Sequence, residues 1–372
     1  MERLTVLHLN TERGWRGGEQ QMSYLARGLA ERGHACHVVC RPDSECERRM
    51  TEAGLPVHPI AIHGDLDVPA ARRIAKLADR IGADVLHAHT SRTHLAAVWA
   101  RRMMRRPARC VVHRRVDFSI HKLPFRLSGL KYRRGVDRYI AVTEAVKRVM
   151  VSDGLDADLI SVVPSGVDLS RFDDAPPAPD LRGELGVPEG ARVVGNVGAL
   201  VDHKDHHNLL DAAALVLKEE PMAFFVIVGE GSLRAALEAH ADALGVGDRA
   251  RFVGFRSDVP QCLRGFDAFC LSSWGEGIGG VVLEAMAARR PVATTSAGGL
   301  DEVVRNGENG LLVPTRNPKA LAEALLNLLR QPEEAQRLAE AGRRTVEEGF
   351  TVGHMIERTL AVYEEAQRAG TK

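Results

Sequence analysis

Short apolar runs alternate with longer amphipathic stretches along this chain, and the series begins twice. The first series opens with the apolar run at 4–9 and the second with the run at 192–198. Strand, helix and parallel strand form the repeating unit of α/β folds. Between the two series, 173–180 is rich in proline and aspartate, which is typical of a linker. The pattern predicts two Rossmann-like, doubly wound α/β domains that face a cleft, with ligands at the carboxyl ends of the strands.

The apolar runs define the expected strands. In the first domain they lie at 4–9, 35–40, 57–62, 85–89, 109–113, 138–142 and 161–164, and in the second at 192–198, 223–229, 250–254 and 267–271. Helices are expected at 19–32, which ends before Gly33, at 281–289, and near the C-terminus at 352–368.

Length and composition are those of an ordinary globular protein with two domains, since the chain has 372 residues. No apolar run is as long as a membrane-spanning helix requires. The run at 1–6 is a strand start rather than a signal peptide. The six cysteines have no metal-ligand spacing, which favours reduced, buried thiols in a cytoplasmic protein.

Positive charge is concentrated between Arg101 and Arg134, where twelve Lys or Arg accompany one acid, Asp117. Apolar side chains such as Phe118 and Phe125 are interleaved with these cations. The mixture favours contact with an anionic membrane surface, here the inner face of the plasma membrane. A solvated helix face with arginines that bind an anionic acceptor is the alternative. No nucleic-acid-binding module is recognisable, so a nucleic-acid partner is not expected.

The segment Trp274–Ala287 carries two carboxylates, Glu276 and Glu284, separated by three glycines and an apolar run. Glu276 falls on the loop before the predicted helix, and Glu284 falls about one turn inside it. Glycines let backbone N–H groups approach a ligand, and a helix N-terminus favours phosphate. The segment therefore predicts a site for a phosphorylated sugar, with hydroxyl groups bound by the carboxylates.

This segment resembles the E-x7-E signature of retaining, nucleotide-sugar-dependent glycosyltransferases of the GT-B fold, glycosyltransferase family four. The downstream stretches at 291–294, 297–299, 302–304 and 309–314 resemble the same family. The resemblance implies transfer of a sugar from a nucleotide diphosphate to a hydroxyl of a glycan or lipid-linked acceptor. It further implies a role in cell-envelope polysaccharide or lipopolysaccharide synthesis, and no metal or other cofactor. The implied domains are 1–180, completed by a C-terminal helix within 352–372, and 181–351.

The resemblance assigns the donor diphosphate to basic residues that follow the strand at 192–198. In the family, an arginine and then a lysine neutralise the diphosphate. This chain keeps Lys204 but has Ala199 at the arginine position, so Lys204 is the expected anchor. The candidates for the missing cation are His203 and Arg256. The other donor-binding residues that the resemblance implies are Gly17, Gly18, Gly198, Gly277, Ile278, Gly279 and Gly280.

The two carboxylates have different expected roles. Glu276 is expected to bind hydroxyls of the transferred sugar and to help stabilise positive charge at its anomeric carbon. Glu284 is expected to accept hydrogen bonds from ribose hydroxyls, because a buried carboxylate without a partner is costly. A salt bridge from Glu284 to Arg289 or Arg290 is the alternative.

Two segments of the first domain, besides the histidines at the end of the strand at 85–89, are candidates for the acceptor site. The loop after the first strand offers Arg13, Trp15 and Arg16 to position the acceptor, and Gly17 and Gly18 precede a helix there. Arg114 and Arg115, after the strand at 109–113, are expected to bind an anionic acceptor.

His87 and His89 form a His-x-His pair at the end of the strand at 85–89. Alternate residues of a strand point to one side, so the two rings share a face. A metal pair is conceivable, but no third ligand is evident and no metal is predicted. The resemblance places His89 beside the acceptor hydroxyl, where it orients and polarises that group, with His87 as its support. The catalytic candidates are His89, Lys204 and Glu276.

Two other functions remain open on the same fold. One is a nucleotide-sugar epimerase or hydrolase, which binds the same donor but uses water or rearrangement. The other is a non-catalytic protein that binds sugar nucleotides, which the alanine at position 199 favours. The sequence determines neither the nucleotide base, nor the sugar, nor the acceptor.

Overall fold

The computed structural model describes residues 2–64, 67–115, 135–173 and 181–368. The chain divides into two compact units, Met1–Gly166 with Val352–Lys372, and Val167–Thr351. The first division lies after Gly166 rather than at 180, because Val167 donates its N–H to Phe350 O at 2.8 Å and forms a bridge with Thr351 inside the second unit. Residues 116–134 of the basic segment and residues 174–180 of the predicted linker lie outside the described residues.

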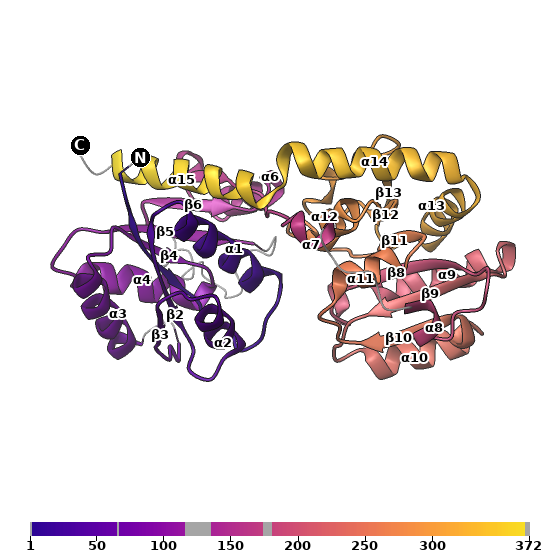
Figure 1. Ribbon diagram of the computed structural model, residues 1–372, viewed down its shortest axis with the longest axis horizontal. Coiled ribbons are helices and arrows are strands. Elements are labelled where there is room, and N and C mark those ends of the chain that lie inside the picture. Colours follow the sequence, from indigo (N-terminus) through magenta and orange to yellow (C-terminus); the bar gives the residue numbers. More distant parts are fainter. Residues whose placement is uncertain (1, 65–66, 116–134, 174–180, 369–372) are drawn as a thin grey trace. The chain divides into compact units, whose positions relative to one another are not determined.

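The first unit is built on a parallel sheet of seven strands in the order β3-β2-β1-β4-β5-β6-β7 (Figure 1). The order reverses between β1 and β4, as in a doubly wound fold. The prediction of a parallel α/β domain is therefore confirmed. The strands are β1 (Thr5–Leu9), β2 (Ala35–Cys40), β3 (Val57–Pro59), β4 (Val85–Ala88), β5 (Arg109–Arg114), β6 (Arg138–Ala141) and β7 (Ile160–Val162).

Several helices of the first unit begin at a residue whose side chain caps the helix. Ser44, Asp67, Thr90 and Thr143 each accept a hydrogen bond from a backbone N–H in the first turn of the helix that follows, which satisfies a donor that the helix leaves free. The helices are α1 (Gly17–Glu31), α2 (Glu45–Glu52), α3 (Val68–Ile81), α4 (Ser91–Met103), α6 (Glu144–Ser152), α15 (Val352–Arg368) and the short η1 (Ala157–Leu159).

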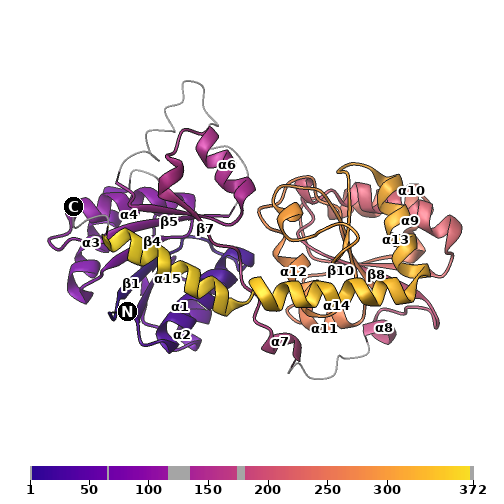
Figure 2. The same cartoon turned by 90° about the horizontal axis from the view of Figure 1, so that it is seen from above.

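The C-terminal helix α15 packs on the sheet of the first unit, beside α1 (Figure 2). Its Ile356 and Tyr363 are buried with Leu25 of α1 and with Val85 and Val111 of the sheet. The two helices approach closely because Gly28 has no side chain. A Cβ atom there would lie 2.1 Å from Ile356 Cδ1.

The second unit is built on a parallel sheet of six strands in the order β10-β9-β8-β11-β12-β13, again with a reversal, between β8 and β11. Its prediction as a second doubly wound domain is confirmed. The strands are β8 (Arg192–Val197), β9 (Ala223–Val228), β10 (Ala250–Gly254), β11 (Ala268–Leu271), β12 (Val292–Thr295) and β13 (Leu311–Val313). The alternation in the sequence did not identify β12 and β13, which are only four and three residues long.

Helices cover the second sheet, and leucines of α13 and α9 fill the core beneath them (Figure 1). The helices of this unit are α7 (Ser170–Asp173), α8 (Leu181–Glu184), α9 (His206–Glu219), α10 (Arg234–Ala243), α11 (Val259–Arg264), α12 (Gly280–Ala287), α13 (Pro318–Arg330) and α14 (Pro332–Gly349), with the short η2 (Asp202–Lys204), η3 (Gly247–Arg249) and η4 (Leu300–Glu302). Within the described ranges, no helix combines the length and apolar character needed to cross a bilayer.

Candidate functional site

Lys204 and Glu276 meet at the switch point of the second sheet. Lys204 ends η2, after β8, and Glu276 follows β11, the neighbouring strand. Lys204 Nζ lies 2.5 Å from Glu276 Oε1, and Ser273 Oγ donates to the same oxygen at 2.7 Å. The side chains are only 17% and 10% exposed, so the pair is largely removed from water. Two candidate residues that are far apart in the sequence thus form one charged unit where α/β sheets bind ligands.

The glycine segment after Glu276 leads into α12 through a left-handed residue. Gly279 has φ +65° and stands at the N-cap, and a Cβ atom there would lie 2.3 Å from Leu300 Cδ2. Gly280 is the first residue of the helix, and a Cβ atom there would meet nothing within 4 Å. The Val282 N–H donates to Gly279 O at 2.7 Å, so the amides that this helix N-terminus can offer to an anion are those of Gly280 and Val281. Gly277 and the buried Ile278 lie on the loop between Glu276 and this helix.

Glu284 lies one turn inside α12 and pairs with Arg171 of α7, whose Nη1 is 3.2 Å from Glu284 Oε1. The alternative, a salt bridge from Glu284 to Arg289 or Arg290, is wrong. Arg290 donates instead to Ala288 O and Phe266 O, and Arg289 has no ion pair within the described residues. Burial raises the pKa of Glu284 above its usual value, and Arg171 only partly opposes that shift. A carboxylate held in this way gains from hydrogen-bond donors such as a diol.

The other residues expected to carry positive charge in this unit are occupied. Arg256 forms ion pairs with Asp258 at 2.7 Å and Glu184 at 2.5 Å, and its role as a replacement for the missing cation stays a prediction. The His203 ring packs edge-on against the Trp274 ring. The backbone carbonyl of His203 accepts a hydrogen bond from the backbone N–H of Trp274. Gly198, by contrast, contacts the candidate anchor. A Cβ atom there would lie 3.7 Å from Lys204 Cδ.

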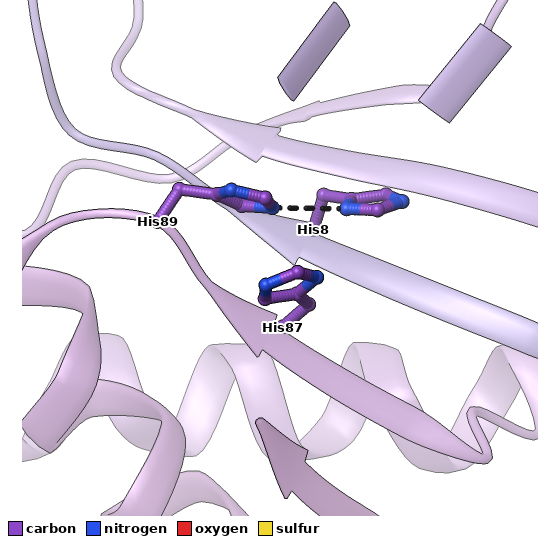
Figure 3. Close-up of side chains that lie close together, drawn as sticks. All are labelled: His8, His87 and His89. Carbon is purple, nitrogen blue, oxygen red and sulfur yellow. Dashed lines mark hydrogen bonds between the residues drawn. The ribbon is translucent and has the colours of Figure 1, made fainter. Parts of the chain in front are cut away.

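Four histidines converge at the carboxyl end of the first sheet, on the face that α15 covers. His8 of β1 is in register with His87 of β4, at the switch point. His89 directly follows β4 and His113 lies on β5, with ring centroids 4.0 and 5.8 Å from that of His87. Figure 3 shows His8, His87 and His89 side by side. The expectation that the His-x-His pair lacks a third ligand is wrong: one nitrogen of each of these three rings lies within 4.8 Å of the others.

Hydrogen bonds fix the orientation of these rings. Arg115 donates to Nδ1 of His113 at 3.2 Å and to Nδ1 of His89 at 3.4 Å. A guanidinium cannot accept, so His89 carries its proton on Nε2 and donates to His8 Nδ1 at 3.0 Å. The Tyr363 hydroxyl of α15 bonds His87 Nδ1 at 2.6 Å. His89 is therefore oriented by two partners, which together occupy both of its ring nitrogens.

Burial keeps this cluster neutral. It lowers the pKa of His8 to about 3 and holds the pKa values of His87, His89 and His113 well below the usual value, with the positive Arg115 contributing to each shift. None of these rings can therefore act as a cation at neutral pH.

Four arginines line a concave surface beside the loop before α1. Arg13 and Arg16 were expected here, whereas Arg41, after β2, and Arg92, in the first turn of α4, were not. Glu12 and Glu19 line the same pocket, which leaves an excess of positive charge. Among the described residues, no carboxylate forms an ion pair with any of the four guanidiniums. The signal in the sequence was their position, since Arg41 directly follows a strand.

Other expected acceptor residues have structural roles. Cζ of Arg49 lies over the Trp15 indole, 4.6 Å from the ring centroid. The indole N–H donates to Gln20 Oε1. Gly17 and Gly18 were expected to precede the helix, but they form its first two residues. A Cβ atom on Gly18 would lie 3.8 Å from Arg115 Cδ, so Arg115 lies beside this helix N-terminus. Arg114 is the last residue of β5.

Comparison with known proteins identifies relatives and structures with the same fold. A lipopolysaccharide core biosynthesis glycosyltransferase of Rhizobium meliloti, LpsE, is 28% identical, over 89% of this chain and 90% of that protein. Spore coat protein SA of Bacillus subtilis is 30% identical, over 66% of this chain and 71% of that protein. The crystal structure of Anabaena Alr3699/HepE in complex with UDP and glucose has the same fold, with a TM-score of 0.86 and 22% identity, over 97% of this chain and 100% of that one.

The two units also match two family models that together span most of the chain. Residues 15–171 match the model of glycosyltransferase family 4, and residues 178–345 match that of group 1 glycosyl transferases. With the fold, the switch-point carboxylates and these matches, the chain belongs to glycosyltransferase family 4 and has the GT-B fold.

Proposed function

We propose that this glycosyltransferase retains the anomeric configuration of the sugar that it transfers from a nucleotide diphosphate donor. The Lys204–Glu276 pair beside the N-terminus of α12 is the observation that carries the proposal. A cation and free amides suit the departing diphosphate, whereas the carboxylate suits the sugar hydroxyls and the positive charge that develops at the anomeric carbon. Binding of the diphosphate then competes with Glu276 for the ammonium of Lys204.

The reaction takes place on one face of the sugar. The bond between the anomeric carbon and the diphosphate oxygen breaks, and the acceptor oxygen bonds to the same carbon on the same face. The acceptor proton passes to the departing phosphate oxygen. To orient the acceptor hydroxyl, His89 would exchange one of its two present partners, Arg115 at Nδ1 or His8 at Nε2, for that hydroxyl, and it need not take the proton. Lys204 and the loop amides balance the charge of the leaving group, so no divalent metal is required.

The donor is a UDP-sugar and the acceptor an anionic glycan or lipid-linked glycan. The complex of Alr3699/HepE with UDP and glucose supports the donor class. Arg13, Arg16, Arg41 and Arg92 support an acceptor that carries phosphate or carboxylate, and the relative in lipopolysaccharide core synthesis supports a cell-envelope role. Such an acceptor would place the enzyme in the cytoplasm, at the inner face of the plasma membrane.

A thermal-shift screen against UDP-, GDP-, ADP- and dTDP-sugars, with and without EDTA, tests the donor. A ligand that binds only the native state raises the melting temperature by mass action. We expect a selective shift with UDP-sugars that survives EDTA and is lost in Lys204→Ala, whereas the exposed Lys319→Ala keeps it. A shift that requires a divalent metal, or one that Lys204→Ala leaves unchanged, would contradict the proposed donor site.

Product analysis tests the reaction. With the preferred donor and a phosphorylated lipopolysaccharide-core oligosaccharide, NMR of the product should show the anomeric configuration of the donor. An inverted product would exclude the retaining mechanism. Conversion of the donor to an altered or free sugar at the same rate without acceptor would instead identify an epimerase or hydrolase, and binding without turnover of any kind would identify a non-catalytic protein.

A further inference from the structure

The histidine cluster of the first unit contains more imidazole nitrogens than its hydrogen bonds use. Nε2 of His8, of His87 and of His113 is buried and has no hydrogen-bond partner within the described residues. Leaving a buried polar group unpaired costs about 1–3 kcal/mol. The Nδ1 atoms of His8 and His113 accept hydrogen bonds, so these two rings carry their protons on Nε2, and the unpaired atom that can bind a cation is Nε2 of His87.

Three of the rings have the arrangement of a metal site. His8, His87 and His89 each offer one nitrogen within 4.8 Å of the other two (Figure 3). The closest pair, His8 Nδ1 and His89 Nε2, is 3.0 Å apart. Two nitrogens bound at 2.0–2.1 Å to a tetrahedral zinc ion are separated by about 3.3 Å, so the His8–His89 pair would need only a small shift, whereas separations of up to 4.8 Å would have to close by as much as about 1.5 Å.

Tyr363 supplies the outer contact that metal-bound histidines usually have. It bonds Nδ1 of His87 at 2.6 Å, whereas Nε2 of that ring has no partner within the described residues. Such contacts fix the ring and its tautomer, and their loss typically costs 10–100-fold in metal affinity.

Arg115 opposes a cation at this place. Its guanidinium is positively charged, and its hydrogen bond to His89 Nδ1 keeps the proton on Nε2, the atom that a metal would need. Binding of a metal to Nε2 would move that proton to Nδ1, so that Arg115 would lose His89 as an acceptor, keep His113, and have to move away from the His89 ring. No proton would leave the protein in this exchange.

We propose that His8, His87 and His89 form a site for one late first-row transition-metal ion, of which Zn²⁺ is the example, and that Arg115 keeps this site closed. Imidazole nitrogens suit Zn²⁺, Ni²⁺, Cu²⁺ and Co²⁺ and do not suit Mg²⁺. Because metal and Arg115 compete for His89, the ion would inhibit transfer rather than assist it. The site is separate from the proposed donor site, which requires no metal.

Co²⁺ titration of the full chain without a histidine tag tests the site, since tetrahedral Co²⁺ has strong visible absorption bands. We expect one equivalent to bind, Zn²⁺ to displace it, and Arg115→Met to raise the affinity by about tenfold or more. Tyr363→Phe should lower the affinity 10–100-fold. His87→Gln should abolish the bands, with circular dichroism to verify that the variant is folded.

A second histidine pair of the same unit provides the matched control. His37 Nδ1 and His58 Nε2 lie 3.1 Å apart and belong to no three-ligand group in the part of the chain that the structure describes. His58→Gln should therefore leave Co²⁺ binding unchanged. Absence of the bands in both the wild type and Arg115→Met would overturn the proposal, as would bands that survive in folded His87→Gln or weaken equally in His58→Gln.

Discussion

Lys204 Nζ and Glu276 Oε1 lie 2.5 Å apart, so that the two expected donor ligands neutralise each other in the free protein. Groups in direct contact do not act independently when they are mutated. Donor binding has to divide this pair, because the ammonium would turn to the diphosphate and the carboxylate to the sugar.

Lys204→Ala and Glu276→Gln should each lower kcat/KM by about 100-fold or more, the scale of removing one preorganised charge-stabilising group. The double variant should lose much less than the product of the two factors, because each single change already disrupts the shared unit. Steady-state kinetics with the preferred donor measure this, and Lys319→Ala is the control. Fully multiplicative losses would show that the two residues act separately.

Lys204→Ala should also destabilise the protein more than the double variant does. The single change leaves the Glu276 carboxylate, only 10% exposed, without its cation, and breaking a buried pair costs about 3–5 kcal/mol. Adding Glu276→Gln removes that unpaired charge. Urea unfolding of the three variants would detect the recovery, and a double variant less stable than Lys204→Ala would contradict it.

Glu284→Gln should raise the KM for the donor by about 10- to 100-fold and change kcat little. A hydrogen bond to a charged group contributes about 1.5–3 kcal/mol. Ribose hydroxyls are remote from the reacting carbon, so their binding is the same in ground and transition states. The matched control is the exposed Glu340→Gln on α14. A loss confined to kcat would place Glu284 at the reacting sugar instead.

Gly195→Ala should destabilise the second unit by about 1–3 kcal/mol or more, the usual cost of overpacking a core. Its Cβ atom would lie 1.9 Å from the Phe266 ring, which is itself buried and cannot withdraw. Gly349→Ala, in α14 and with nothing within 4 Å, should be neutral or slightly stabilising. Equal unfolding free energies for the two variants would contradict this account of the core.

His206 should make unfolding depend on pH. Its ring is buried and bonds Asn196 Oδ1 at 3.1 Å, and burial lowers its pKa to about 4. The unfolded chain therefore takes up a proton near pH 6.5 while the folded protein does not, so stability falls between pH 6.5 and 4 and then levels off. At 1.36 kcal/mol per pKa unit, the shift amounts to about 3 kcal/mol.

His206→Gln keeps a donor for Asn196 but cannot titrate. Its free energy of unfolding should decline less than that of the wild type between pH 6.5 and 4, by about 3 kcal/mol, in parallel urea titrations. The difference between the two proteins isolates His206 from every other group that titrates. Identical pH profiles would mean that the His206 ring is hydrated in the folded protein.

The sequence by itself determined the two parallel sheets and the ends of most strands. Buried parallel strands read as short apolar runs between polar segments, so β2 and β10 match their predicted ranges and most others differ by one or two residues. It missed β12 and β13, although strands of the same length, such as β3 and β7, were identified. The resemblance to the family also singled out Lys204, Glu276, Glu284 and His89, whose roles stay predictions.

Only the tertiary structure decided which of these residues meet. Register places His8 beside His87, 79 positions later, and no local pattern encodes such a distance. In the same way folding brings Arg171 to Glu284, Lys204 to Glu276, and Arg41 and Arg92 to Arg13 and Arg16. Spacing along a chain predicts which face of an element a residue occupies, but contacts between elements depend on strand order and on the packing of many side chains at once.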